Sequence, residues 1–121
     1  MSDRRYTTRL TDEQIVELFT NHIFHVDIDL AIVTNLVTGN QMTPYIGNTE
    51  GHRFVRIYYN QSRRTTALHR LVWMFATLTP IPTGWEIHHR DSDTSHNAFS
   101  NLLCLHQLDH RKLHAETELP F

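Results

Sequence analysis

Cysteine, glycine and proline are scarce in this sequence, and long apolar runs are missing. Its 121 residues include one cysteine, Cys104, with four glycines and four prolines. A single cysteine excludes an internal disulfide and a zinc site made only of cysteines, and it fits a reducing compartment. Polar residues break every apolar stretch, so we expect no membrane-spanning segment, and the first residues lack the apolar core of a signal peptide. We therefore expect a cytoplasmic protein.

Histidine stands out in a composition that is otherwise that of a globular protein. Hydrophobic residues make up 40% of the chain and charged residues 20%, and the length suits one domain. There are ten histidines, and six of them lie between His88 and His114. Histidine is the commonest metal ligand in proteins and a common general base. The clustering of six histidines therefore indicates a metal or acid–base site near the C-terminal end.

Acidic and basic residues are unevenly distributed. The net charge of −2 taken alone argues against binding to nucleic acid. Residues 10–50 carry six acids and no base, whereas residues 51–85 carry five arginines and no acid. The arginines are interleaved with Tyr58 and Tyr59, and such a basic segment suits contacts with phosphate. A solvated hairpin face is the alternative for a charge run of this kind.

Hydrophobic spacing divides the chain into short helices and strands, the first of them opened by a capping box at Thr11 and Gln14. The expected elements are a helix over 12–22, a strand over 26–37, a hairpin of strands 53–59 and 64–68, a helix over 68–77, strands over 85–89 and 102–105, and a helix from 107 to about 118. The last three form a small strand–strand–helix unit. We expect an α+β fold with a helix and strand region over 1–50 and a second region over 51–121, joined in one compact unit.

Four histidines have the spacing of a metal site. His110 and His114 are four residues apart on the expected terminal helix, so they share one face and can hold a metal together. His88 and His89 are adjacent on a strand, so one can bind metal while the other faces a substrate. A metal ion and a histidine base are sufficient to hydrolyse a phosphodiester. A structural zinc clip is the alternative.

This constellation resembles the HNH endonuclease motif. The residues that carry the resemblance are His88, His89, Asp91, Asn97, Asn101, Leu102, His110 and His114. The preceding segment, with His69 and the prolines Pro80 and Pro82, is similar to the lead-in of phage-borne HNH homing endonucleases. The resemblance covers residues 51–114 and implies an antiparallel hairpin region followed by a ββα-metal unit that acts on DNA.

The resemblance also implies a role for each motif residue. His89 would be the general base, and Asn101 would fix the loop and help to orient that base. Asp91 and Asn97 would brace the loop between the two strands. The implied ligands of one divalent metal ion, which is Mg, Mn, Zn or Ni, are His88, His110 and His114. His96 stands where the family usually has asparagine, and Ser92 stands where glycine is common, so the shape of the loop differs from the family pattern.

Several arginines are candidates for DNA contacts, and they are Arg53, Arg56, Arg63, Arg64 and Arg90. We expect a phage-encoded, divalent-metal-dependent DNA endonuclease in the host cytoplasm. DNA is its expected partner, and a further phage protein is left open as a second one. Two alternatives remain. One is a catalytically inactive DNA-binding module with a structural zinc site, and the other is an interaction adaptor that reuses the fold.

Overall fold

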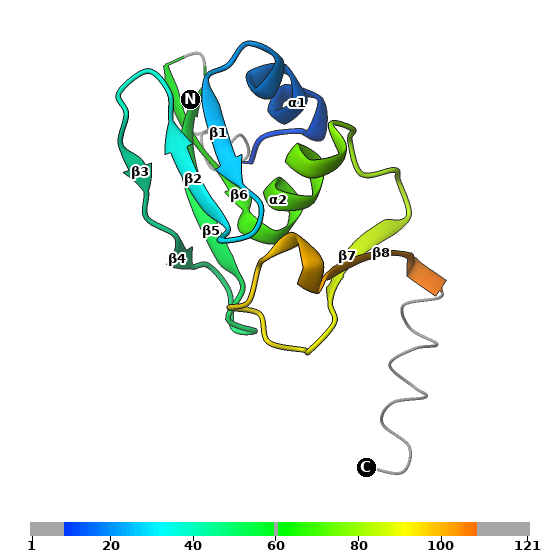
Figure 1. Ribbon diagram of the computed structural model, residues 1–121. Helices are drawn as coiled ribbons and strands as arrows, with labels where there is room; N and C mark the ends of the chain where they lie inside the picture. The colour runs from blue at the N-terminus through cyan, green and yellow to red at the C-terminus, as the bar shows by residue number, and fades with distance from the viewer. Residues whose placement is uncertain (1–8, 60, 109–121) are drawn as a thin grey trace, which may run out of the picture.

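The computed structural model describes residues 9–59 and 61–108 as a small α+β fold with two α-helices and short antiparallel sheets (Figure 1). The elements in chain order are α1 (Asp12–Thr20), β1 (Phe24–Asp27), β2 (Ile32–Asn35), β3 (Gln41–Met42), β4 (Tyr45–Ile46), β5 (Arg53–Tyr59), β6 (Ser62–Ala67), α2 (Leu68–Thr77), β7 (Trp85–His89), the short 3-10 helix η2 (Phe99–Asn101) and β8 (Leu102–His106). The sheets are β1–β2–β3, β4–β5–β6 and β7–β8.

The first helix begins at the expected capping box. The Thr11 hydroxyl accepts the N–H of Gln14 at 3.1 Å, and the Gln14 side chain accepts the N–H of Thr11 at 2.9 Å. The residues that α1 buries are Ile15, Leu18 and Phe19. The helix ends at Thr20 rather than at residue 22, because His22 has a left-handed φ of 57° that a right-handed helix cannot continue.

The segment expected as one strand over 26–37 is a hairpin instead. β1 ends at Asp27, and β2 runs back antiparallel to it. The Asp27 carboxylate accepts the backbone N–H groups of Asp29 and Leu30, both at 3.0 Å, and Ala31 has a positive φ of 56°. The carboxylate therefore stabilises a turn in the middle of an unbroken alternating pattern. Periodicity alone could not locate this reversal.

α2 lies at the centre of the molecule and has the expected bounds. In Figure 1 the sheets β1–β3 and β4–β6 lie on one side of it, and β7 and β8 lie on the other. Leu71, Val72 and Met74 have no exposed surface. Phe75 is only partly buried and packs edge-on against Phe19 with ring centroids 4.9 Å apart. The helix ends where Leu78 takes a left-handed φ of 56°.

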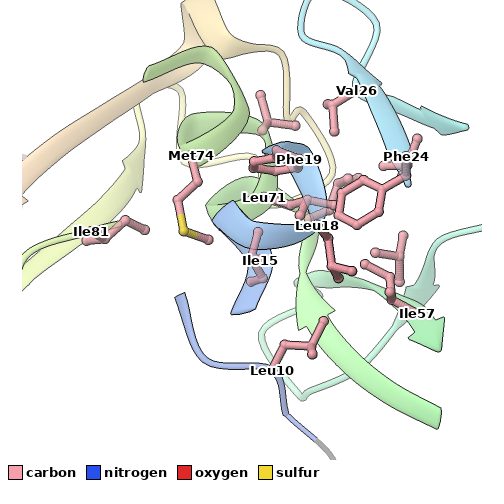
Figure 2. Close-up of a cluster of buried hydrophobic side chains, with 14 of the residues drawn as sticks. Leu10, Ile15, Leu18, Phe19, Phe24, Val26, Ile57, Leu71, Met74 and Ile81 are labelled. Atoms are coloured by element: carbon pink, nitrogen blue, oxygen red, sulfur yellow. The ribbon is translucent and has the colours of Figure 1, made fainter. Parts of the chain in front are cut away.

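One apolar core joins the N-terminal elements to the rest of the described chain. Figure 2 shows Ile15 and Phe19 of α1, Phe24 of β1 and Leu71 of α2 packed together. The same cluster continues to Leu102 at the start of β8. Full burial of each such side chain contributes about 1.5–3 kcal/mol. The core therefore crosses the expected boundary at residue 50.

β7 and β8 form the two-stranded sheet expected near the C-terminal end. Their register pairs His88 with Leu103 and His89 with Leu102. The expected terminal helix starts at Gln107, and its residues from 109 onward lie outside the described residues. No helix among the described residues is long and apolar enough to cross a membrane.

Candidate active site

β7 carries the two adjacent histidines with their side chains on opposite faces. His89 shares a face with Ile87 and is 4% exposed, whereas His88 is half-buried. The β7 ladder with β8 holds both positions, because every β7 residue has a cross-strand partner. The alternation expected from the sequence is therefore present, and His89 lies on the buried face.

Asn97 orients the imidazole of His89. The Asn97 NH₂ group donates to the backbone carbonyl of Thr94 at 3.3 Å, so its Oδ1 atom is the one that faces His89. The distance from His89 Nε2 to Asn97 Oδ1 is 2.8 Å. Because an amide oxygen only accepts, Nε2 is the donor and carries the proton. In the neutral ring the lone pair then belongs to Nδ1.

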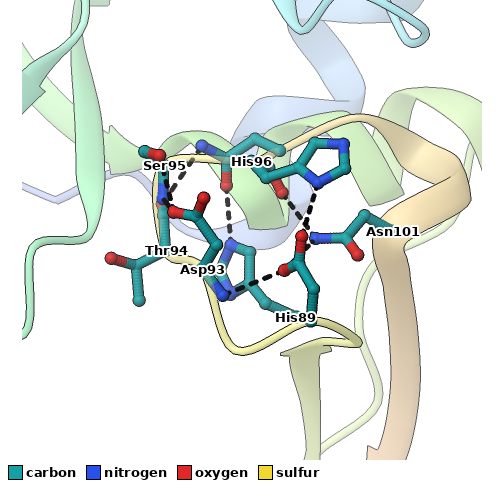
Figure 3. Close-up of polar contacts among 8 residues, drawn as sticks. His89, Asp93, Thr94, Ser95, His96 and Asn101 are labelled. Carbon is teal, nitrogen blue, oxygen red and sulfur yellow. Dashed lines mark hydrogen bonds and ion pairs between the residues drawn. The ribbon is translucent and has the colours of Figure 1, made fainter.

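Asp91 and Asn101 fix the loop after β7. Figure 3 shows Asn101 next to His96 of this loop. The Asn101 amide donates to Asp91 Oδ1 at 2.9 Å and to the backbone carbonyl of His96 at 2.8 Å. His96 Nδ1 lies 2.7 Å from Asp91 Oδ2. The hydrogen bond with His96, followed by those from the Asp93 N–H and from Asn101, holds the pKa of Asp91 well below its usual range. Asp91 is therefore an ionised carboxylate that accepts the hydrogen bonds holding the loop together.

The resemblance implied that Asn101 both fixes the loop and orients the base. In the structure these two roles belong to different residues. Asn101 donates to Asp91 and to the His96 carbonyl of the loop, whereas the hydrogen bond to His89 comes from Asn97. Ser92 stands where the family commonly has glycine, and its backbone conformation explains that preference. Ser92 has a left-handed φ of 62°, a region that favours glycine, and its N–H donates to the His89 carbonyl at 3.1 Å.

Two further histidines surround His89. Its ring centroid lies 5.0 Å from that of His69 in the first turn of α2, and 5.8 Å from that of His52 just before β5. The centroids of His52 and His69 are 5.1 Å apart. Burial, then the neighbouring His89 and His52, lowers the pKa of His69 to about 3. Burial and His89 also lower the pKa of His52, against a smaller opposing effect of Glu50.

Sequence reasoning missed this cluster of three histidines. It gave His52 no role and used His69 only as part of the lead-in to the motif. The three residues come from separate segments, and no local spacing connects them. Only the packing of α2 between β5 and β7 brings the rings together.

A cavity of about 300 Å³ opens beside these groups. Its lining residues are Glu50, His52, Ile87, His88, His89, Ser92 and Thr94. The Thr94 hydroxyl donates to the Glu50 carbonyl at 3.0 Å, which joins the loop after β7 to the loop before β5. The cavity is therefore walled by two loops that are distant in the sequence, and both adjacent histidines reach it.

Only one of the expected metal ligands, His88, lies in the described part of the chain. Its half-buried imidazole lines the cavity, and imidazole nitrogen is a suitable donor for Zn or Ni. His110 and His114 lie outside the described residues. Within residues 9–59 and 61–108 no group of three histidine, cysteine or acidic residues is arranged to hold a metal ion.

The candidate DNA-contacting arginines do not share one surface. Arg56 and Arg63 are exposed on the outer face of the β5–β6 hairpin, together with Tyr58, which pairs with Arg63. Arg64 pairs with Ile57, so it lies on the other face, where its Nε atom is buried. The guanidinium of Arg53 donates to the Gly51 carbonyl. Arg90 is exposed in the loop after β7.

The arrangement can be compared with known proteins. The sequence model of a family described as HNH endonuclease matches residues 66–112. This part of the chain is therefore similar to the HNH endonuclease family. The match includes His88, His89, Asn101 and His110, whereas His114 lies just beyond it. No curated protein sequence matches the chain.

A solved structure of an HNH nuclease has the same fold. It is that of the HNH homing endonuclease I-HmuI, determined to describe DNA binding and cleavage by that enzyme. The TM-score is 0.66 at 18% sequence identity, and the match covers 83% of this chain. It covers 56% of the I-HmuI chain, so this chain spans little more than half of that enzyme. The similarity therefore extends the shared fold beyond the family motif into the N-terminal elements.

Proposed function

We propose that this protein is a divalent-metal-dependent DNA endonuclease in which His89 is the general base. The observation that carries the proposal is the bond from His89 Nε2 to Asn97 Oδ1 at 2.8 Å, which leaves Nδ1 as the basic nitrogen. His89 also lines the same cavity as His88. A base held in one tautomer beside a proposed metal ligand is the arrangement that phosphodiester hydrolysis needs.

In the proposed reaction, His89 Nδ1 takes a proton from a water molecule. The water oxygen forms a bond to phosphorus, and the bond from phosphorus to the leaving sugar oxygen breaks. Asn97 keeps the ring oriented during this step, and Asn101 with Asp91 holds the loop that carries Asn97. Solvent supplies the proton to the leaving oxygen. His89 returns its proton to solvent after the cleavage.

The proposed ligands of the metal ion are His88, His110 and His114. A bound ion of Mg, Mn, Zn or Ni would neutralise charge on the scissile phosphate and on the leaving oxygen. For the DNA backbone, the three exposed arginines of the candidate set, Arg56, Arg63 and Arg90, are the proposed contacts. Such contacts position DNA without reading its sequence. The lead-in around His69, which is similar to that of phage-borne enzymes, supports a phage-encoded protein that acts in the host cytoplasm.

Cleavage of supercoiled plasmid DNA across a series of metal ions tests the proposal. We expect the parent protein to nick or cut the plasmid, and His89→Ala to lose about 100–10,000-fold in rate, because a general base supplies that factor. Metal content should be the same in both proteins, and His89→Ala should stay folded but melt at a lower temperature, because the loss of a buried ring leaves a cavity. Equal rates would contradict the role of His89. A His89→Ala protein that has lost its metal or its fold would favour the structural zinc site instead.

A further inference from the structure

His52 occupies a wall of the proposed active site without belonging to the HNH motif. It lies between the loop 47–51 and β5, outside the segment that the family model matches. Its ring faces that of His89 at 5.8 Å between centroids, and it lines the cavity that His88 and His89 also reach. The side chain is half-buried, so part of the ring is accessible from the cavity.

Asn48 fixes the tautomer of His52. The backbone N–H of His52 donates to Asn48 Oδ1 at 3.0 Å, which identifies that atom as the oxygen. The Asn48 NH₂ group then lies 3.0 Å from His52 Nδ1, while Oδ1 is farther from it at 3.3 Å. A proton on Nδ1 would point at the hydrogens of the NH₂ group. Nδ1 is therefore the acceptor, and in the neutral ring the proton belongs to Nε2.

The loop that carries His52 is held against the loop after β7. Thr94 donates to the Glu50 carbonyl, and Gly51 has a positive φ of 86°. A Cβ atom on Gly51 would lie 3.0 Å from the Thr94 hydroxyl, so the two loops approach closely there. His52 is consequently fixed at its backbone, at Nδ1 and at the adjoining loop. Its remaining nitrogen, Nε2, is a donor with no role in this support.

We propose that His52 is a further catalytic residue, which donates a hydrogen bond from Nε2–H to an oxygen of the bound phosphodiester. The inference rests on the proposed function and adds His52 to it as a hydrogen-bond donor. His89 accepts a proton at Nδ1, whereas His52 offers one without transferring it. Negative charge grows on the phosphoryl and leaving oxygens during hydrolysis, and a fixed donor aimed at such charge is worth about 100–1,000-fold in kcat.

Three substitutions separate hydrogen-bond donation from packing. His52→Phe keeps a flat ring against His69 and His89 but has no donor. His52→Ala lacks both, and His52→Gln keeps an N–H donor on a shorter flat group. His25→Phe is the matched control, because His25 is an exposed histidine on β1 whose ring packs against Phe75 rather than against the cluster. Each variant is assayed on plasmid DNA for kcat and KM, and is compared with the parent by circular dichroism and thermal melting.

We expect His52→Phe and His52→Ala to lose about 100-fold in kcat with KM little changed, because the donor acts on charge that develops in the transition state. His52→Gln should retain more activity than His52→Phe, and His25→Phe should cleave at the parent rate.

A His52→Phe protein that cleaves at the parent rate, or better than His52→Gln, would overturn the inference. So would the loss of folding in both His52→Phe and His52→Ala, since His52 would then be a structural residue. In these cases a parent enzyme that still depends on His89 would leave the proposed function standing. A parent protein that cleaves no DNA with any metal ion would overturn both.

Discussion

His69 is the member of the histidine cluster with the most strongly lowered pKa. Its Nδ1 atom is buried and has no hydrogen-bond partner, and its ring packs against both His52 and His89. Burial and the two neighbouring rings together oppose a positive charge, so the pKa of His69 falls to about 3. At neutral pH the imidazole of His69 is uncharged, and the ring of the proposed base, His89, packs against it.

The lowered pKa predicts how acid affects stability. An unfolded His69 binds a proton below about pH 6.5, whereas the folded protein binds it only near its own pKa of about 3. The free energy of unfolding should therefore fall as the pH decreases from 6.5 towards 3, by up to about 1.4 kcal/mol per pH unit from this group.

Urea denaturation at a series of pH values checks this prediction. His69→Leu should remove that part of the slope. Asp91 also has a lowered pKa and also costs stability in acid, but it is present in both proteins and cancels in the comparison. Parallel stability curves for His69→Leu and the parent would contradict the burial argument.

Two helices and the connector to β7 meet at a single carboxylate. Asp12 at the start of α1 accepts two hydrogen bonds from Arg70 Nη2 of α2, at 2.7 and 2.9 Å, and one from the Ile81 N–H at 3.0 Å. The Asp12 side chain is only 17% exposed. A largely buried carboxylate that satisfies a guanidinium and a backbone donor stabilises a fold more than a surface ion pair does.

Asp12→Asn should lower the free energy of unfolding by about 1–3 kcal/mol, because Arg70 and the Ile81 N–H then compete for one neutral oxygen. Glu13→Gln is the matched control, since it removes the same charge from the same helical turn at an exposed position. That control should cost only the helix-dipole contribution of about 0.3–1 kcal/mol. Urea denaturation measures both. Equal losses would show that the three-way contact adds nothing.

Elements that follow from local chemistry were predictable, and those set by tertiary contacts were not. The capping box at Thr11 and the helix α2 matched their sequence patterns because adjacent residues determine them. The β1–β2 turn was missed because Asp27 reverses the chain inside an alternating pattern. The cluster around His89, and the choice of Asn97 as its partner, depend on loops and strands from distant parts of the chain.

The outer face of the β5–β6 hairpin is the surface that we propose for contacts with a DNA backbone. Arg56 lies over the Tyr45 ring, 4.1 Å from its centroid, and Arg63 is exposed beside Tyr58. β5 begins next to His52, so this face extends away from the proposed active site along the strand. DNA that lies across the cavity would meet these arginines on one side of the cut.

Arg56→Ala and Arg63→Ala should each weaken DNA binding and reduce the salt slope of the binding constant by about one unit, the value for one lost phosphate contact. Arg64→Ala is the control, because Arg64 lies on the opposite face of the same hairpin. Fluorescence anisotropy without divalent metal, over a range of salt concentrations, measures the slopes. A larger effect of Arg64→Ala than of Arg63→Ala would assign the DNA to the other face.

The pairing of β7 has a consequence for the timing of activity during synthesis. Within the described residues, the strand that carries His88 and His89 has β8 as its hydrogen-bonded neighbour, and Asn101 closes the loop between them. A nascent chain emerges from the ribosome N-terminal part first, so α1, β5 and α2 can pack before β8 exists. The proposed base would then lack its strand ladder, and Asn101 would not yet close the loop that carries Asn97. The proposed endonuclease would therefore acquire its catalytic geometry only after β8 has paired with β7.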